Sequence, residues 1–335
     1  MKLKERLVYF NGKFVPEREA KISIYDSALI FGDMVFEMTR SFNKKHFKLR
    51  EHIDRLYYGL KILRININIS KDQMYNACLQ TAKVNEHLFE KDDEHRLMID
   101  VSRGLLGIYH NIDGLNKGPN VIIADFPVRW TVSGMGKLFD TGINAVIPSQ
   151  RVIPSSLMDP KVKNRSRLFY LMANIEVSQF KGDNNWALML DPDGFVAEGA
   201  GDNFFIIKNE VVISPEGRNI LRGISRSYII NELCPEMEIK VLEKNLEPFD
   251  VYTADEAFVT GTPFCMLPVT SLNSVKIGDG KVGKLTKKLL KEWSNLVGVD
   301  IVKQIKSWDL KENKGGTTPY KFSNNSTLTM AIEEN

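Results

Sequence analysis

The first 127 residues alternate between two spacings of apolar positions, one typical of strands and the other of helices. Short runs rich in Val, Ile, Phe and Tyr predict strands at 7–10, 13–16, 22–25, 33–40, 46–49, 96–103 and 120–126. The Asn11-Gly12 pair between the first two runs predicts a hairpin turn. Apolar residues at three- and four-residue intervals predict helices at 51–63 and 70–88, the second capped by Ser70. This half is therefore predicted to be a small α/β domain.

A glycine-rich break follows at 134–142, within a segment, 128–142, that we predict to connect two domains. A surface loop is the alternative interpretation of this stretch. Residues 143–310 carry strand patterns at 144–148, 186–190, 204–207, 211–213 and 256–260, with helices predicted at 166–180, 224–233 and 282–296. The sequence thus predicts a larger, strand-rich C-terminal domain. The polar stretch at 311–335 is predicted to be a disordered or loosely attached tail.

The bulk composition excludes several classes of protein. With 335 residues, the chain is long enough for two domains with separate cores. Its 45 basic and 42 acidic residues leave a net charge of +3, too small to favour nucleic acid as a partner. No apolar run is long enough to span a membrane. Cys78, Cys234 and Cys265 have neither a disulfide-rich pattern nor metal-ligand spacing, and we see no secretory signal, so we expect a cytoplasmic protein without a metal.

The segment from 191 to 226 has the most specific chemistry. Glu198 lies in a glycine-flanked turn between two apolar runs, where its carboxylate suits a pyridine ring nitrogen or caps a backbone N–H. Residues 223–225 open a predicted helix, whose free N–H groups suit an anion or serve as an ordinary N-terminus. The turn at 260–263 is equally able to hold phosphate or carboxylate, and Arg55 is a further candidate for a phosphate contact.

A lysine completes this set of groups. Lys163 stands just before a predicted amphipathic helix, and Lys161, two residues earlier, is its competitor. A lysine that forms a Schiff base needs a lowered pKa and must face a carbonyl group. The minimum set of groups for pyridoxal 5′-phosphate (PLP) chemistry is a lysine, a carboxylate and a turn that binds phosphate. We therefore expect PLP as the cofactor.

The order of several motifs resembles one known family. The motifs are NGKFVP, DSALIFGDMVFEMTR, EHIDRL, VAEGAGDNFF, ILRGISR and ADEAFVTGTP, spread over residues 8–308. In this order they resemble the fold-type IV (class IV) PLP-dependent aminotransferases, which include branched-chain and D-amino acid aminotransferases and aminodeoxychorismate lyase. They are most similar to the branched-chain enzymes. The resemblance implies a mixed α+β (α/β) fold of two domains, like that of D-amino acid aminotransferase.

The resemblance also implies roles for single residues. It favours Lys163 over Lys161, because the family lysine is followed thirteen residues later by a glutamate, here Glu176. Lys163 is then the catalytic residue, which forms a Schiff base with PLP and later moves the substrate's proton. The other implied cofactor contacts are Glu198 with the ring nitrogen, Leu221 with the ring face, and Arg55, Gly223, Ile224, Ser225 and Thr262 with the phosphate. The substrate is expected to meet Phe36, Arg103, Thr262 and Pro263.

Three positions depart from the pattern of the branched-chain enzymes. Leu168 stands five residues after the lysine, where many of them have a tyrosine near the cofactor's O3′. Tyr170, Arg165 and Ser166 are the other candidates for that contact. The stretch 96–98 lacks the family's Tyr-x-Arg pair. Pro263 replaces an alanine and has no N–H, so a carboxylate held by consecutive amides of this turn would lose one donor.

The expected activity is the transfer of an amino group to 2-oxoglutarate from an amino acid, in the first place a branched-chain L-amino acid. The alternatives are a D-amino acid or amine transaminase, an aminodeoxychorismate lyase-like enzyme, and a PLP-binding protein without catalysis. The presence of both Lys163 and Glu198 argues against the last. The partners are then small amino acids and keto acids, and the family implies a homodimer or a higher homo-oligomer.

Overall fold

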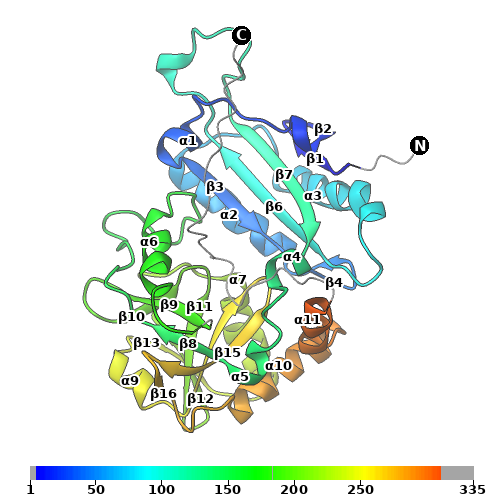
Figure 1. Cartoon of the computed structure of the whole chain (residues 1–335). Helices are drawn as coiled ribbons and strands as arrows, with labels where there is room; N and C mark the ends of the chain where they lie inside the picture. Colours follow the sequence, from blue (N-terminus) through cyan, green and yellow to red (C-terminus); the bar gives the residue numbers. More distant parts are fainter. Residues whose placement is uncertain (1–4, 183, 311–335) are drawn as a thin grey trace, which may run out of the picture.

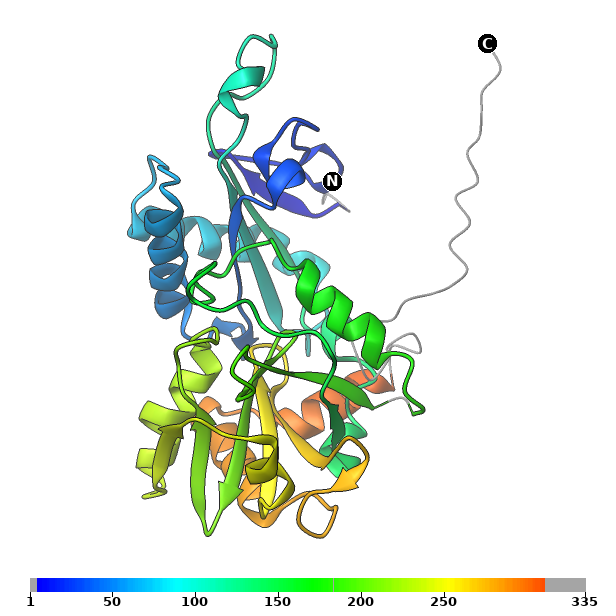
Figure 2. The same ribbon diagram turned by 90° about the vertical axis from the view of Figure 1, so that its left-hand side faces the viewer.

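The computed structural model describes residues 5–182 and 184–310, which form two main β-sheets with helices around them (Figure 1). All strands of the first sheet lie between residues 7 and 127, and all strands of the second between 143 and 276. The two sheets lie one above the other in Figures 1 and 2. The domain boundaries themselves stay a prediction, and the predicted tail at 311–335 lies outside the described residues.

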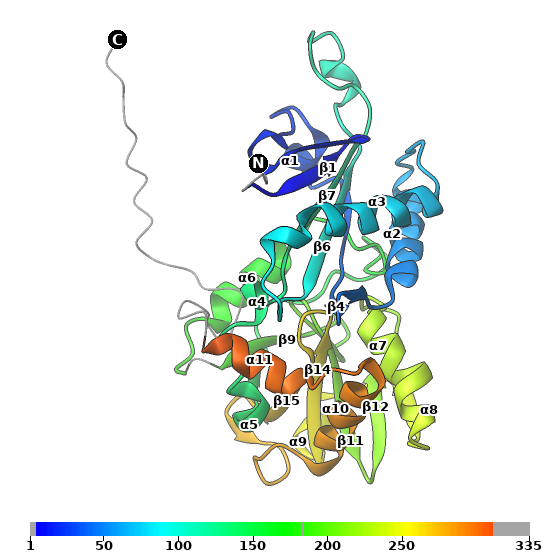
Figure 3. The same ribbon diagram turned by 90° about the vertical axis from the view of Figure 1, so that its right-hand side faces the viewer.

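The first sheet is antiparallel and has five strands. Its order is β2 (Lys13–Pro16), β1 (Leu7–Phe10), β7 (Asn120–Pro127), β6 (His95–Ser102) and β3 (Met34–Met38). Helices α2 (Leu49–Leu63) and α3 (Lys71–Asn85) pack on one face of this sheet (Figure 3). The side chains of β3 alternate between the two faces, so Val35 meets these helices while Phe36 lines a cavity on the other side.

Local sequence explains how several of these elements begin and pack. Asn11 and Gly12 have φ values of 49° and 89°, as the tight turn between β1 and β2 requires. Ser70 begins α3 with a capping box, because its side chain accepts from Gln73 N while the Gln73 side chain accepts from Ser70 N. Gly59 lets α2 approach the sheet closely, since a Cβ there would lie 2.8 Å from Val35 Cγ1.

One predicted strand of this half is wrong, and another is confirmed only in part. Residues 22–25 form no strand; the chain turns and enters α1 (Ser27–Phe31), whose first turn is capped by Asp26 Oδ1 accepting from Ala28 N at 2.8 Å. The strand predicted at 46–49 is shorter: β4 (Ser41–Phe42) and β5 (Lys45–His46) form a small hairpin, after which α2 begins at Leu49. In both places a helix begins within a few residues, α1 at Ser27 and α2 at Leu49, which leaves little room for an extended strand.

The segment 128–142 joins the two sheets. It contains two short helices, α4 (Arg129–Val132) and α5 (Leu138–Thr141), rather than an extended linker. Val132 and Leu138 are buried and belong to the core of the second sheet. Gly136 N donates at 2.9 Å to Asp309 Oδ2, at the end of the last described helix. The glycine-rich stretch is therefore a packed connection.

The second sheet has nine strands. They are β8 (Ile143–Val146), β9 (Asn185–Leu190), β10 (Val196–Gly199), β11 (Asn203–Lys208), β12 (Val211–Pro215), β13 (Val241–Lys244), β14 (Glu256–Gly261), β15 (Cys265–Leu272) and β16 (Val275–Lys276). The pairings run through β10, β9, β8, β15, β14 and β11, and β11 pairs again with β10. These strands therefore close into a barrel-like ring, from which β12 and β13 extend.

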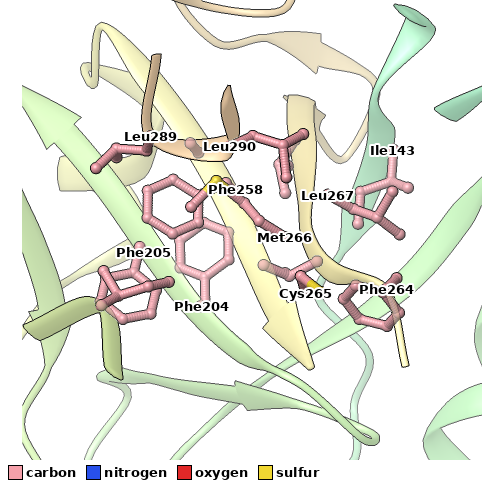
Figure 4. Close-up of a cluster of buried hydrophobic side chains, with 14 of the residues drawn as sticks. Ile143, Phe204, Phe205, Phe258, Phe264, Cys265, Met266, Leu267, Leu289 and Leu290 are labelled. Atoms are coloured by element: carbon pink, nitrogen blue, oxygen red, sulfur yellow. The ribbon is translucent and has the colours of Figure 1, made fainter. Parts of the chain in front are cut away.

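The second sheet has the larger core (Figure 4). Phe205 and Phe258, on neighbouring strands β11 and β14, stack with their ring centroids 4.8 Å apart. Helix α10 (Lys284–Val297) covers this core with residues such as Leu289, and α11 (Ile301–Asp309) follows it. Successive residues of β9 face different clusters: Leu188 joins this core, and Met189 packs with α6 (Leu168–Val177). Burial on both sides explains why these strands read as continuous apolar runs.

The remaining helices are short. α7 (Ile224–Tyr228) runs on through a π-helical turn at Ile229–Leu233 into α8 (Cys234–Glu236), and α9 (Pro248–Tyr252) precedes β14. Single 3-10 turns lie at Glu17–Glu19, Glu86–Leu88 and Gly107–Tyr109. In the part of the chain that the structure describes, no helix has the length and apolar character needed to cross a membrane.

Candidate active site

A cavity lies where β3, the segment 152–170 and the turns after β10, β12 and β14 come together. Its empty volume is about 810 Å³, open solvent at the mouth included. Of the residues predicted for the site, it brings together Phe36, Arg55, Lys163, Glu198, Leu221, Gly223, Ile224, Ser225 and Thr262. Lys161, Arg103 and Pro263 are not among its lining residues. Residues from both halves of the chain thus share one cavity.

Backbone hydrogen bonds fix Lys163 on the free edge of β3. Phe36 N donates to Lys163 O at 2.9 Å, and Arg165 N donates to Met34 O at 3.0 Å. This segment therefore extends the first sheet by one short pairing. Helix α6 begins only at Leu168, so Lys163 lies on an extended stretch and not at a helix entrance as the sequence suggested.

Burial changes the protonation of Lys163. Desolvation, together with the charges of Arg55 and Arg167, lowers the pKa of its ammonium group to about 7. Its Nζ lies 4.7 Å from the centroid of the Phe36 ring. A lysine with a lowered pKa is more often a neutral amine near neutral pH, and the neutral amine is the form that attacks a carbonyl carbon.

Lys161 has a different environment. Its Nζ lies 2.9 Å from Asp159 Oδ1 and donates to Arg218 O at 3.1 Å. Both contacts engage the ammonium group away from the cavity lining. The geometry therefore favours Lys163 as the lysine that meets a carbonyl group.

Glu198 is a buried carboxyl group held by three donors. Tyr170 Oη donates to its Oε1 at 2.6 Å, and Asn203 Nδ2 and Leu221 N donate to its Oε2 at 3.1 and 3.0 Å. Asn203 is also its cross-strand partner on β11, so the pairing of β10 with β11 fixes this arrangement. Desolvation raises the pKa of Glu198 to about 7. Such a carboxyl group is suited to share a proton with a ring nitrogen brought into the cavity.

The turn before α7 contains a close approach that only glycine permits. A Cβ at Gly223 would lie 2.1 Å from Asn203 Oδ1. Gly223 is the N-cap residue of α7, and Ser225 is buried just beyond it. Arg55 reaches this turn from α2 and donates through Nη1 to Arg222 O at 2.9 Å. An arginine and the free N–H groups of a helix start therefore meet at one place, as an anion such as phosphate requires.

Glu37 and His52 support Arg55, and our reading of the sequence missed both. Glu37 is fully buried and accepts from Arg55 Nε at 2.6 Å and from Arg55 Nη2 at 2.8 Å. His52 Nδ1 lies 2.7 Å from Glu37 Oε2. Burial opposes the negative charge of Glu37, but Arg55 and His52 outweigh it and hold its pKa far below the ordinary range. The available signal was an acidic residue inside an apolar strand, with His52 and Arg55 three residues apart on a helix.

Arg103 and Pro263 are engaged elsewhere. Arg103 Nε donates to Asp33 Oδ2 at 2.5 Å, and its Nη2 donates to Leu63 O at 2.8 Å. Pro263 O accepts from Arg40 Nη1 at 3.0 Å. The other two residues predicted to meet the substrate, Phe36 and Thr262, do line the cavity.

The candidates for the cofactor's O3′ contact separate clearly in space. Leu168 is 68% exposed and does not line the cavity. Arg165 donates through Nη2 to Asp100 Oδ1 at 2.8 Å and does not line it either. Ser166 and Tyr170 are lining residues, and the Tyr170 hydroxyl is bonded to Glu198. The geometry therefore leaves Ser166 and Tyr170 as the candidates beside the cavity.

Two further charged residues line the cavity, and no motif singled them out. Asp202 lies close to Glu198 in the turn after β10, and desolvation with the charge of Glu198 raises its pKa to about 7. Arg167, just before α6, donates through Nη2 to Ala200 O. Both become visible only when the turn after β10 and the start of α6 are brought together in space.

The chain belongs to the class IV aminotransferases. The family model described as amino-transferase class IV matches residues 34–272, a range that contains every lining residue of the cavity. Its fold is that of the fold-type IV enzymes, as solved structures similar to it confirm. The protein is therefore an aminotransferase, and the cavity is its candidate active site.

Individual relatives are similar over almost their whole length. The putative branched-chain-amino-acid aminotransferase of Methanocaldococcus jannaschii is 37% identical over 290 residues, which cover 86% of this chain and 96% of that one. The crystal structure of the Escherichia coli branched-chain amino acid aminotransferase has a TM-score of 0.79 at 28% identity, covering 88% of this chain and 95% of that one. The T.th. branched-chain amino acid aminotransferase complexed with N-(5′-phosphopyridoxyl)-L-glutamate has a TM-score of 0.75 at 26% identity, with the same coverage.

Proposed function

We propose that this aminotransferase uses PLP to transfer the amino group of a branched-chain L-amino acid to 2-oxoglutarate. The observation that carries the proposal is a cavity in which Lys163, with a pKa of about 7, shares walls with Glu198 and with the anion site at Arg55 and Gly223. The M. jannaschii relative and the E. coli structure support branched-chain substrates by name. The T.th. enzyme is complexed with N-(5′-phosphopyridoxyl)-L-glutamate, which supports PLP as the cofactor. The glutamate part of this ligand supports 2-oxoglutarate as the acceptor, because 2-oxoglutarate is the keto acid of glutamate.

The residues of the cavity fit PLP. The groups that would hold it are Arg55, the N–H groups at 223–225 and Thr262 for the phosphate, Glu198 for the ring nitrogen, Leu221 for the ring face and Lys163 for the carbonyl carbon. The cradle at Gly223, which a Cβ would fill, leaves the helix start open to an anion. When bound, PLP supplies a conjugated ring that takes up electrons from the substrate's Cα–H bond.

The chain's own groups then hold and move protons. Lys163 Nζ, with a pKa of about 7, can accept and return a proton at neutral pH, so we assign to it the proton transfer at the substrate's Cα. Glu198 would share a proton with the ring nitrogen of a bound cofactor, while Tyr170 and Asn203 hold its two oxygens in position. The Phe36 ring beside Nζ shields the amine from water.

A second candidate is a transaminase for D-amino acids or simple amines, or an aminodeoxychorismate lyase-like enzyme. The missing Tyr-x-Arg pair at 96–98 favours it, because this stretch lies beside the substrate side of the sheet. Asp100 is the direct partner of Phe36, so Met98, two residues away, lies on the same face as Phe36. A methionine therefore stands where the branched-chain enzymes often have an arginine.

We further propose that the enzyme is a cytoplasmic homodimer. Leu29, Phe31, Leu168 and Met172 are apolar side chains with exposed fractions of 61, 66, 68 and 47%. They come from α1 and α6, and the hydrogen bond from Ser166 Oγ to Phe31 O joins the end of α1 to the segment that leads into α6. An apolar surface of this kind fits a second copy of the chain. The three buried free thiols suit a reducing compartment.

Replacement of Lys163 by alanine tests the cofactor assignment. The Lys163→Ala variant is expected to lose both amino transfer and the visible absorbance band of a Schiff base between protein and PLP. The matched control is Lys161→Ala, which should retain both, because Lys161 contacts Asp159 and Arg218 away from the cavity. Full amino transfer by Lys163→Ala, or its loss in Lys161→Ala, would contradict the assignment.

A further inference from the structure

Arg167 brings a cation to the candidate active site four residues after Lys163. It is the residue before α6 and lines the cavity. Its guanidinium carbon lies 4.8 Å from the centroid of the Tyr170 ring and 5.5 Å from that of Phe36. Both rings belong to the same cavity wall as Lys163 and Glu198. Arg167 therefore sits among the groups that handle the substrate.

Arg167 forms no ion pair with a carboxylate among the described residues, although its charge acts on the buried Glu198 and partly offsets the desolvation that raises the pKa of that group. Its Nη2 donates to the carbonyl oxygen of Ala200, which is a neutral partner. The other arginines of this region are compensated: Arg55 by Glu37 and Arg165 by Asp100. A guanidinium group has five N–H donors in a planar fork that matches a carboxylate. A guanidinium group in the cavity without an ion-pair partner among the described residues thus fits an anionic ligand.

The phosphate of the cofactor is not the anion that Arg167 suits best. The protein groups that we assign to the phosphate are Arg55 and the turn at 223–225, and the hydrogen bond from Arg55 to Arg222 O holds them together. Arg167 contacts Ala200 and Tyr170 instead, and Tyr170 is bonded to Glu198. The anion left for Arg167 is therefore one that the substrate brings.

The turn after β14 contains a residue without an N–H donor. Gly261 and Thr262 line the cavity, whereas Pro263 does not and has no N–H to give. The carbonyl of Pro263 is held by Arg40, a buried residue, so the turn is fixed in this orientation. A carboxylate in the cavity consequently needs a donor from another element, and Arg167 is the lining residue with donors to spare.

We propose that Arg167 is a substrate-binding residue that receives a carboxylate of the amino acid or keto acid, and so selects acids over amines. This inference rests on the proposed transaminase function and names the group by which that function recognises its substrates. Two carboxylates satisfy it: the one attached to Cα, common to all amino acids, and the second one of a dicarboxylate such as 2-oxoglutarate. The chemistry is the same for both, and the experiment separates them.

The experiment measures the binding of unreactive acids to the PLP-loaded enzyme by calorimetry. The probes are 4-methylpentanoate, glutarate and the neutral amide 4-methylpentanamide, each titrated into wild type and Arg167→Gln. A hydrogen-bonded charge pair contributes enough that its loss is expected to weaken acid binding by about 10- to 100-fold. Binding of the amide should change little, because it carries no negative charge.

The pattern among the probes tells which carboxylate is bound. Weaker binding of both acids assigns Arg167 to the carboxylate common to all substrates, and weaker binding of glutarate alone assigns it to the second carboxylate of dicarboxylates. Arg165→Gln is the matched control: its guanidinium carbon lies 3.7 Å from the centroid of the same Phe36 ring, but its charge is paired with Asp100. This variant should leave the ratio of acid to amide affinity unchanged. Arg167→Lys, which keeps the charge without the fork, should lie between wild type and Arg167→Gln.

Equal acid affinities in wild type and Arg167→Gln would overturn the inference, as would an equal loss for acids and amide or a wild type that binds neither acid. Because the ratio is taken within one preparation, a partly unfolded variant does not imitate the expected result. Amino transfer by the wild type tests the proposed function separately. A wild type that transfers no amino group contradicts that function, even if the loss of acid binding in Arg167→Gln still supports a carboxylate site.

Discussion

Replacement of Glu37 by glutamine tests the buried network beneath the phosphate site. Glu37 is fully buried and accepts two hydrogen bonds from Arg55, while His52 Nδ1 lies 2.7 Å from its second oxygen. Glutamine keeps one oxygen as an acceptor, but its amide N–H group would face the N–H groups of Arg55 or the ring of His52. The substitution also removes the negative charge that balances Arg55. Breaking a buried ion pair by removing one partner costs about 3–5 kcal/mol of the free energy of unfolding. The Arg55 side chain is only 12% exposed, so solvent screens this loss little.

Urea unfolding of the apoenzyme measures this loss. Glu51→Gln is the matched control, because the Glu51 side chain lies on the same helix as Arg55 but is 49% exposed, 3.4 Å from Lys48 Nζ. An exposed pair of this kind contributes about 0–1 kcal/mol. A loss in Glu37→Gln no larger than in Glu51→Gln would refute the reasoning, since the network would then contribute nothing to the fold.

The same variant has a predicted pH dependence. The folded-state pKa of Glu37 is lowered, because Arg55 and His52 outweigh the burial that opposes its charge. A group of this kind stabilises the fold fully above its unfolded pKa of about 4.3, and the stabilisation is lost as the pH falls toward the folded value. The stability difference between wild type and Glu37→Gln should therefore shrink in acid below about pH 4. A difference that grows in acid would contradict the assignment.

The remaining predictions concern the lysine and the helix start. Because desolvation, Arg55 and Arg167 lower the pKa of Lys163 to about 7, PLP should attach to the apoenzyme faster as the pH rises from about 6 to about 8 and level off above, as stopped-flow absorbance would record. A rise that continues to about pH 10 would mean an unperturbed lysine. Gly223→Ala should weaken PLP binding by about tenfold in equilibrium dialysis, because the new Cβ would meet Asn203 Oδ1. Gly217→Ala, whose Cβ would come no closer than 3.4 Å to Arg222 Nε, should bind PLP like wild type.

The helices of the first half could be predicted because their signals are local. The apolar period of α2 and the Ser70 cap of α3 depend only on neighbouring residues, and the structure confirms both elements within a few positions. β15 was not predictable in this way. Pro268 interrupts its apolar run, and prolines are rare inside central strands. Its place between β8 and β14 is set by pairing partners distant in the sequence, with Pro268 opposite Phe258.

The residues of the candidate site also differ in whether local sequence or tertiary contacts determine their place. Residues carried by ordered motifs, such as Lys163 and Glu198, could be named in advance, and the structure brings them into one cavity. Arg103 and Pro263 were also named in advance, but tertiary contacts with Asp33 and Arg40 engage them elsewhere. The lack of an ion pair for Arg167 among the described residues could not be read from the sequence at all. Whether a charge is paired depends on which carboxylates the fold brings near it, and sequence spacing contains no such information.

The most direct test of the account is the half-reaction of the PLP-loaded enzyme with single amino acids in the absence of any acceptor. L-leucine, L-isoleucine, L-valine, their D-enantiomers and simple amines would each be mixed with the enzyme, and the visible band of the bound cofactor followed over time. The proposed function predicts rapid loss of this band with the L-forms, and its recovery when 2-oxoglutarate is added. Loss of the band only with D-amino acids or amines would contradict the proposed substrate.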